Sequence, residues 1–247
     1  MFIGSPNLPD KKVTLCVASV DSEMGKKLSD IDISVISPNI SKDLAKPVSS
    51  HADMLMHHLG NNNIVVAKKQ NLLKAALEAN GFHVRLSDNY LHKDYPRDIL
   101  LNACRIGNVL IAKKDSLDTF ILEYCENNGI RIINTNQGYA KCSLCIVDEK
   151  SIITADKSLY QTLSLNGFDV LLISPGNIDL PGYSYGFIGG CCGLINKGLL
   201  AFTGEIELHP DFMKIKEFLF SKNTEYISLR KGKLIDIGGI IPLIEQD

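Results

Sequence analysis

Asn80-Gly81-Phe82-His83-Val84-Arg85-Leu86 decides the fold, because its pattern returns twice further along the chain. The later copies are Asn128-Gly129-Ile130-Arg131-Ile132-Ile133 and Asn166-Gly167-Phe168-Asp169-Val170-Leu171-Leu172-Ile173. In each copy the glycine stands where the end of a helix needs a residue that tolerates positive φ, and the apolar residues after it are typical of a buried strand. Each copy therefore predicts a junction between a helix and a strand.

A helix and two short strands are predicted upstream of each junction. The helical stretches are 71–80, 116–128 and 156–166. The paired strands are 53–56 with 64–67, 98–101 with 109–112, and 142–147 with 151–154. The repeating unit is thus strand, strand, helix, strand.

Two further units follow the same plan. The fourth has strands at 186–190, 199–202 and 225–229 and a helix at about 210–221. The fifth is split between the chain ends, with 233–243 at the C-terminus and 13–17, 22–29 and 31–36 at the N-terminus. We therefore expect one α/β domain over residues 1–247, with units at about 48–90, 91–137, 138–180, 181–230, and 231–247 joined to 12–38. A unit shared between both ends of the chain would close the five units into a ring, and the ring would have no loose sheet edge.

Other repeat architectures fit the pattern less well. A solenoid of helix pairs would lack the β-branched strands, and a propeller of four-stranded blades would lack the helices. An ordinary doubly wound α/β sheet stays open, because its βα units also resemble one another.

Composition excludes several classes of protein. The chain has 26 basic and 28 acidic side chains, which argues against a strongly basic nucleic-acid surface. No apolar run approaches the roughly 18–20 residues that span a bilayer, and residues 1–12 lack the apolar core of an export signal. The 7 cysteines are an odd number, which favours reduced thiols. We therefore expect a cytoplasmic protein that contacts no membrane.

His51-Ala52-Asp53 opens the first strand of the first unit. Residues i and i+2 of a strand point to the same face, so both side chains are expected to face the central channel. Two units further on, the corresponding strand opens with Gly138-Tyr139-Ala140-Lys141-Cys142.

The five units and these motifs resemble the pentein α/β propeller. That superfamily includes arginine and agmatine deiminases, dimethylarginine hydrolases, amidinotransferases and the non-catalytic ribosome anti-association factor of archaea and eukaryotes. In the enzymes a His-x-Asp motif supplies the proton shuttle and a guanidinium-binding acid, and the nucleophilic cysteine comes two units later. The resemblance implies these roles for His51, Asp53 and Cys142.

Two acids of the resembled enzymes are absent or displaced. Agmatine deiminases carry Glu-Gly-Gly where this chain has Ile237-Gly238-Gly239, although Asp236 is one residue away. The fourth unit shows Tyr185-Gly186-Phe187 in place of an acidic anchor. We expect Asp53, Asp98 and Asp236 to bind the substrate through charge-assisted hydrogen bonds.

A thiol becomes a nucleophile only as the thiolate, so Cys142 needs a cation or a base nearby. We expect His51 to pair with it and to act as general acid and base. Cys145, Cys191 and Cys192 are alternative thiols. A free cysteine is also commonly a small buried apolar residue, which is the competing interpretation.

The remaining motifs indicate no metal and no cofactor. The Cys142-x-x-Cys145 pair has no second Cys-x-x-Cys, and the adjacent His57 and His58 would point to opposite faces of a strand. The glycine-rich stretch 189–193 lacks the Lys-Ser/Thr ending of a phosphate loop. Loops with tyrosines at 90–95 and 183–185 lead into two units, where binding groups commonly lie.

Our leading hypothesis is a cysteine-dependent hydrolase of the deiminase or dihydrolase kind. Its substrate would be a small amidine- or guanidine-like cationic metabolite, attacked by Cys142 to give a covalent thiol adduct. An amidinotransferase shares this first step and differs in having an amine resolve the adduct. The alternative is a non-catalytic binding protein resembling the ribosome factor. The sequence leaves a homodimer open.

Overall fold

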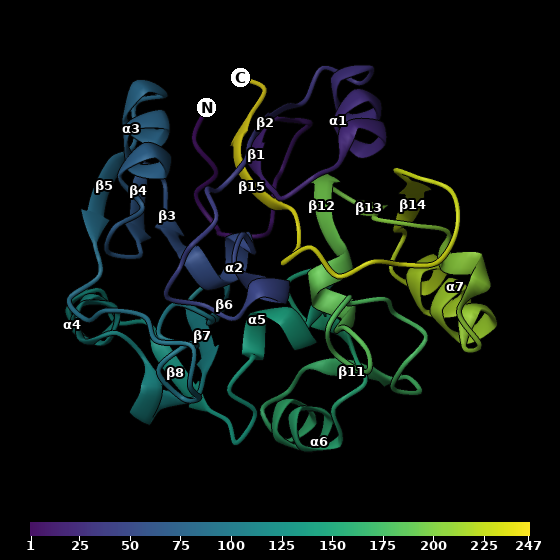
Figure 1. The fold of residues 1–247 in the computed structure, drawn as a ribbon. Helices are drawn as coiled ribbons and strands as arrows, with labels where there is room; N and C mark the ends of the chain where they lie inside the picture. Colours follow the sequence, from purple (N-terminus) through teal and green to yellow (C-terminus); the bar gives the residue numbers. More distant parts are fainter.

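The computed structural model describes residues 1–247 as a ring of five three-stranded sheets (Figure 1). In every sheet the first strand is antiparallel to the second, and the second is parallel to the third. Four sheets come from continuous stretches: β3 (Met56–Gly60), β4 (Asn63–Val66) and β5 (His83–Leu86); β6 (Cys104–Ile106), β7 (Val109–Ala112) and β8 (Arg131–Asn134); β9 (Cys145–Ile146), β10 (Ser151–Thr154) and β11 (Asp169–Leu172); and β12 (Cys192–Asn196), β13 (Leu199–Phe202) and β14 (Glu225–Ser228). The predicted five-unit α/β propeller is confirmed.

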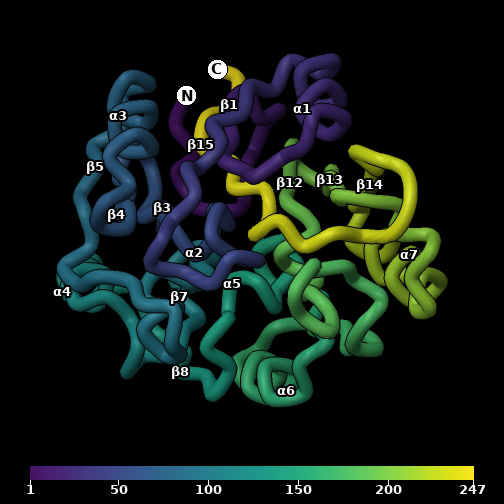
Figure 2. The backbone as a smooth tube through the Cα atoms, in the orientation of Figure 1, coloured from purple at the N-terminus to yellow at the C-terminus, as the bar shows by residue number.

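The fifth sheet joins the two ends of the chain. β15 (Ile241–Glu245) pairs antiparallel with β1 (Val13–Val17), which pairs parallel with β2 (Ser34–Ile36). The C-terminal strand runs beside the N-terminal segment (Figure 2), and the amino group of Met1 donates to the Glu245 carbonyl at 2.6 Å. The predicted closure of the ring by both termini is confirmed.

Five helices cover the outside of the ring (Figure 1). They are α1 (Ser22–Ser29), α3 (Asn71–Ala79), α4 (Thr119–Asn127), α6 (Lys157–Leu165) and α7 (Phe212–Ser221). Each buries two side chains spaced four residues apart, such as Leu73 and Leu77 of α3, which is one stripe of an amphipathic helix. Gly81, Gly129 and Gly167 follow three of these helices with φ of 88°, 63° and 86°, as the repeat predicts.

Helical turns, rather than strands, lie at the centre of the ring. α2 (Ala52–Leu55), α5 (Ala140–Ser143) and the 3-10 helix η3 (Ile188–Cys191) each precede the first strand of a unit. The predicted strand at 53–56 and the strand starts at 142 and 186 were therefore wrong, and 98–101 also forms turns before β6. Almost every side chain in these stretches is buried, so the apolar pattern has no period that separates a strand from a helix. The shorter 3-10 helices are η1 (Lys46–Val48), η2 (Lys114–Ser116) and η4 (Ile206–Leu208).

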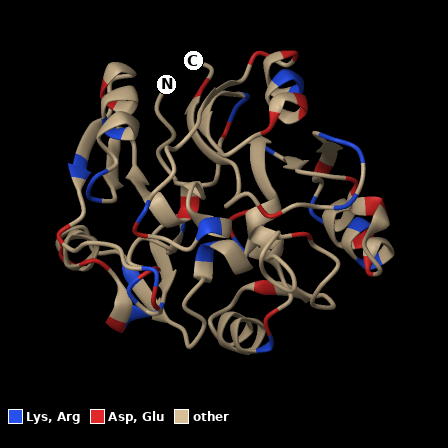
Figure 3. Cartoon of the chain, viewed as in Figure 1, with Lys and Arg blue, Asp and Glu red and all other residues tan.

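Charged residues of both signs are interspersed around the outer elements (Figure 3). None of the helices combines the length and the apolar character needed to cross a membrane.

Leu243 tests how much the closing sheet contributes to stability. It is fully buried in β15 and belongs to the largest hydrophobic cluster. We expect Leu243→Ala to lower the free energy of unfolding by about 2–5 kcal/mol, because it removes buried methyl groups and leaves a cavity. Chemical denaturation measures this loss, with Leu165→Ala, at a leucine that is 88% exposed, as the matched control. Equal effects of the two substitutions would contradict the assigned closure.

Candidate active site

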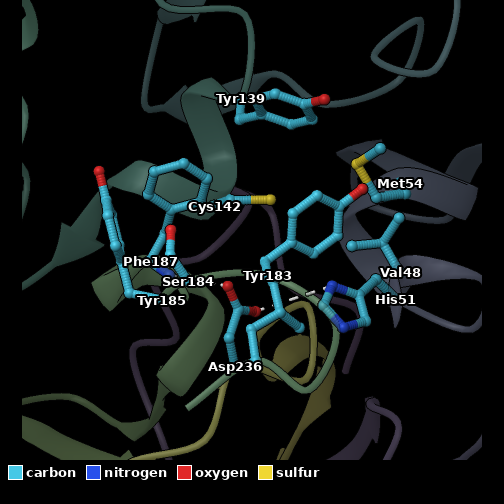
Figure 4. A pocket seen from close by; sticks show the side chains of 11 residues that line it. Val48, His51, Met54, Tyr139, Cys142, Tyr183, Ser184, Tyr185, Phe187 and Asp236 are labelled. Atoms are coloured by element: carbon cyan, nitrogen blue, oxygen red, sulfur yellow. Dashed lines mark hydrogen bonds and ion pairs between the residues drawn. The ribbon is translucent and has the colours of Figure 1, made fainter. Parts of the chain in front are cut away.

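A cavity of about 230 Å³ opens near the centre of the ring (Figure 4). It is lined by Val48, His51, Met54, Tyr139, Cys142, Leu180, Tyr183, Ser184, Tyr185, Phe187 and Asp236. Three residues predicted from the sequence, His51, Cys142 and Asp236, therefore meet at one cavity although they come from three different units.

Cys142 lies in α5 and is 3% exposed. Its Sγ donates a hydrogen bond to Asp53 Oδ2 at 2.9 Å and accepts one from Asn102 Nδ2 at 3.0 Å. The expected pairing of Cys142 with His51 is thus replaced by a contact with the acid two residues later. The cause is local geometry, because His51 is the N-cap of α2 whereas Asp53 lies inside that helix.

Asn102 joins the two central helices. Its Nδ2 also donates to the Asp53 carbonyl at 3.1 Å, and its Oδ1 accepts from the backbone N–H of Lys141 at 2.9 Å. Sequence reasoning missed this residue. The available signal was a polar side chain directly after the apolar run 99–101, which identifies a buried polar group without naming its partners.

The pKa of the Cys142 thiol is raised well above its ordinary value. Burial is the largest cause, followed by the negative charges of Asp53 and Asp236 and by the hydrogen bond to Asp53. The hydrogen bond from Asn102 acts in the opposite direction. Burial and these charges therefore favour the protonated thiol at neutral pH.

His51 and Asp236 form the second polar pair. His51 Nδ1 lies 3.7 Å from Asp236 Oδ1 (Figure 4). The Asp236 carboxylate accepts hydrogen bonds from the backbone N–H of Phe187 at 2.8 Å and of Gly238 at 3.0 Å. Burial raises the pKa of Asp236. The interaction with His51 lowers that pKa, and the negative charge of Asp53 raises it further. The prediction that His51 and Asp53 share one face of a strand was wrong, because the chain is helical from Ala52 onward.

Two glycines make room for this pair. A Cβ at Gly190 would overlap the Asp236 carboxylate, and one at Gly238 would overlap His51. Gly238 also has φ of 77°, a conformation that strains residues with a side chain. The glycine-rich stretch 189–193 thus serves close packing.

Asp98 does not line the cavity, in contrast to the role expected from the sequence. It is 5% exposed, and its Oδ2 accepts a hydrogen bond from the Tyr139 hydroxyl at 2.6 Å. Burial and the acceptor Asp98 raise the pKa of Tyr139, so the phenol stays a neutral donor. Asp98 therefore positions the Tyr139 ring, which lines the cavity.

The other thiols and Lys141 lie behind the cavity. Cys145, Cys191 and Cys192 are buried and do not line it. Lys141 is 5% exposed, with its Nζ 3.5 Å from the Gly189 carbonyl. Burial lowers the pKa of Lys141, but the nearby acidic groups, first Cys104 and then Asp53, raise it above its ordinary value. A charged ammonium that does not line the cavity therefore partly offsets the negative charge of Asp53.

No three histidines, cysteines or acids are placed to hold a metal ion.

Solved structures of guanidino-modifying enzymes share this fold. The chain is similar to SxtG, an amidinotransferase from Microseira wollei, with 10% identity, a TM-score of 0.56 and coverage of 92% of this chain and 91% of that one. It is similar to agmatine deiminase of C. jejuni, with 9% identity, a TM-score of 0.53 and coverage of 93% and 90%. It is also similar to DDAH of Pseudomonas aeruginosa, with 8% identity, a TM-score of 0.56 and coverage of 88% and 92%.

These likenesses show that the chain has the fold of the pentein enzymes. Residues 16–241 match the model described as "Family of unknown function (DUF6873)", and the chain belongs to that family. No curated protein matches the sequence.

Asp53→Asn tests the electrostatics of the thiol. The substitution removes the negative charge nearest to Sγ, so we expect the apparent pKa of Cys142 to fall and its alkylation below that pKa to accelerate. Iodoacetamide labelling across a pH series, with mass spectrometry to locate the label, measures this shift. Asp169→Asn, at an exposed carboxylate paired with Lys222, is the control for the change in net charge. An unchanged pH profile would show that Asp53 does not control the thiol.

Proposed function

We propose that this chain is a cysteine-dependent C–N hydrolase that acts on a small cationic amidine or guanidine through a covalent adduct on Cys142. The observation that carries the proposal is the convergence of a thiol, an imidazole and the Asp236 carboxylate at one cavity, with the Asp53 carboxylate hydrogen-bonded to the thiol. The pentein fold supports it, since solved structures of that fold include an agmatine deiminase and amidinotransferases.

Substrate recognition follows from the two carboxylates. An amidinium ion is planar and carries paired N–H donors, which suit charge-assisted hydrogen bonds to a carboxylate such as Asp236, which lines the cavity. Asp53 adds a second negative charge beside Cys142. Its positive charge offsets the two negative charges that hold the thiol protonated. Binding of the substrate therefore lowers the pKa of Cys142 and produces the nucleophile in place.

The reaction consumes one water and proceeds in two steps. In the first, the Cys142 thiol gives its proton to His51 and its sulfur attacks the amidinium carbon, so that the C–S bond forms; the C–N bond then breaks as His51 passes that proton to the departing amine. In the second, His51 removes a proton from water, whose oxygen attacks the same carbon. The C–S bond then breaks, and the thiol recovers its proton. An amidinium and water thereby give an amide and an ammonium ion, or a urea where the substrate is a guanidinium.

A non-catalytic binding protein is the second candidate. The observation that favours it is the resting state of Cys142, which is buried, protonated and hydrogen-bonded to an acid. The two functions differ in whether a cation in the cavity activates the thiol.

A pair of alkylating reagents of nearly equal shape separates these functions. 2-Chloroacetamidine carries an amidinium, whereas 2-chloroacetamide is neutral. We expect the cationic reagent to label Cys142 about tenfold or more faster at neutral pH, because a charge-assisted hydrogen bond contributes about 1.5–3 kcal/mol. Labelling rates at Cys142, followed by mass spectrometry, give the ratio directly.

Asp236→Asn and Asp169→Asn are the matched variants for this experiment. The first removes a carboxylate of the cavity, so the preference for the cationic reagent should fall toward one. The second leaves the cavity intact and should keep the preference. Equal labelling of the wild type by both reagents would count against the hydrolase and favour the binding protein.

A further inference from the structure

We infer that the substrate carries a planar apolar group beside its cationic head and has no carboxylate. This inference rests on the proposed function and deepens it, because it specifies the rest of the molecule that the amidinium or guanidinium belongs to.

The cavity divides into a polar floor and an apolar wall. His51, Asp236 and Cys142 supply the polar groups. Most of the remaining lining is hydrophobic, and its aromatic members are Tyr139, Tyr183, Tyr185 and Phe187 (Figure 4). A ligand that satisfies both parts has a cation at one end and an apolar body at the other.

The aromatic rings form a preorganised wall. The ring centroids of Phe187 and Tyr139 lie 6.0 Å apart, and the rings stack with an interplanar angle of 27°. The ring of Tyr185 packs edge-on against that of Phe187, with the ring centroids 6.3 Å apart. The Tyr139 hydroxyl donates a hydrogen bond to buried Asp98. Rings fixed in this way can stack on a planar substituent without losing much conformational entropy.

The wall continues to the mouth of the cavity. Tyr183 is 51% exposed and Tyr185 is 43% exposed, so both rings are only partly covered by the protein. Exposed tyrosine rings at the mouth offer apolar surface and also favour a passing cation through their π faces.

A carboxylate on the substrate has no partner here. No lysine or arginine lines the cavity, and the only charged acid that does line it is Asp236. The positive charge of Lys141, which does not line the cavity, already offsets part of the negative charge of Asp53. A carboxylate brought into this cavity would lose its hydration and face like charges without compensation. Amino-acid substrates are therefore disfavoured.

Three amidines test this inference by isothermal titration calorimetry with the full chain. Acetamidine has only the cationic head, benzamidine adds a planar ring, and 4-amidinobenzoate adds a carboxylate to that ring. We expect benzamidine to bind about tenfold more tightly than acetamidine, since one aromatic contact beyond area burial gives about 0.5–1.5 kcal/mol and ring burial adds to it. We expect 4-amidinobenzoate to bind more weakly than benzamidine.

Variants at Tyr183 test whether the aromatic wall causes the tighter binding of benzamidine. Tyr183→Ala should weaken the binding of benzamidine by a larger factor than that of acetamidine, because only benzamidine carries a ring that can stack on the wall. Tyr183→Arg should raise the affinity for 4-amidinobenzoate above that of the wild type, and Tyr160→Arg, at a partly exposed tyrosine of α6, is the control for added charge. Circular dichroism confirms that each variant is folded, and an arginine variant that gains nothing would count against placing the substituent beside Tyr183.

The outcomes separate this inference from the proposed function. Benzamidine that binds no more tightly than acetamidine, or 4-amidinobenzoate that binds as well as benzamidine, would overturn the inference alone if the cationic reagent still labels Cys142 selectively. Loss of that selectivity together with the absence of amidine binding would overturn the proposed function.

Discussion

The pairing of β15 with β1 holds the two ends of the chain together, and the position of Asp236 depends on it. Asp236 lies in the segment that leads into β15 and belongs to no strand. That segment is fixed by hydrogen bonds from Ile237 N and Gly239 N to the Gly190 carbonyl, both at 2.9 Å. The segment therefore runs between the fourth unit and the fifth sheet, and the Asp236 carboxylate lies 3.7 Å from His51 Nδ1 of the first unit. The site is thus assembled by closure of the ring.

Sequence reasoning was reliable for the outer parts of the propeller and unreliable for its centre. Glycines after helices and amphipathic stripes are local signals, so the repeats, the outer helices and the shared fifth unit followed from them. The central turns are buried on nearly all sides, and α2 and α5 were mistaken for strands. His51 and Cys142 were placed at one site because their motifs and cyclic order resemble those of the pentein enzymes, and cyclic order does not depend on local geometry. Asn102 could not be found in this way, because its function is a set of contacts to residues far away in the chain.

The charges around Cys142 support the proposal that the site takes a cation. Burial raises the pKa of the thiol most, Asp53 and Asp236 raise it further, and Asp53 also raises the pKa of Asp236. The positive charge of Lys141 partly offsets the negative charge of Asp53, and the His51 imidazole lies beside the Asp236 carboxylate. The cavity lies between these groups and receives the remaining negative potential. In surroundings of low dielectric constant this potential is only weakly screened, so a small cation is the ligand with the largest electrostatic gain.

Both departures from the agmatine-deiminase pattern have a structural meaning. The side chain of Ile237, where those enzymes carry glutamate, is buried in a hydrophobic cluster, and the shorter acid Asp236 reaches His51 from the preceding position. The fourth unit has no acid, but the backbone N–H of Phe187 holds Asp236 while its ring lines the cavity. Asp236 thus places an acid beside His51 from a neighbouring position, and the fourth unit contributes an aromatic ring to the cavity. If the proposed function holds, this arrangement keeps the polar groups around the thiol and alters the surface that contacts the rest of the substrate, so it should affect specificity before it affects the reaction.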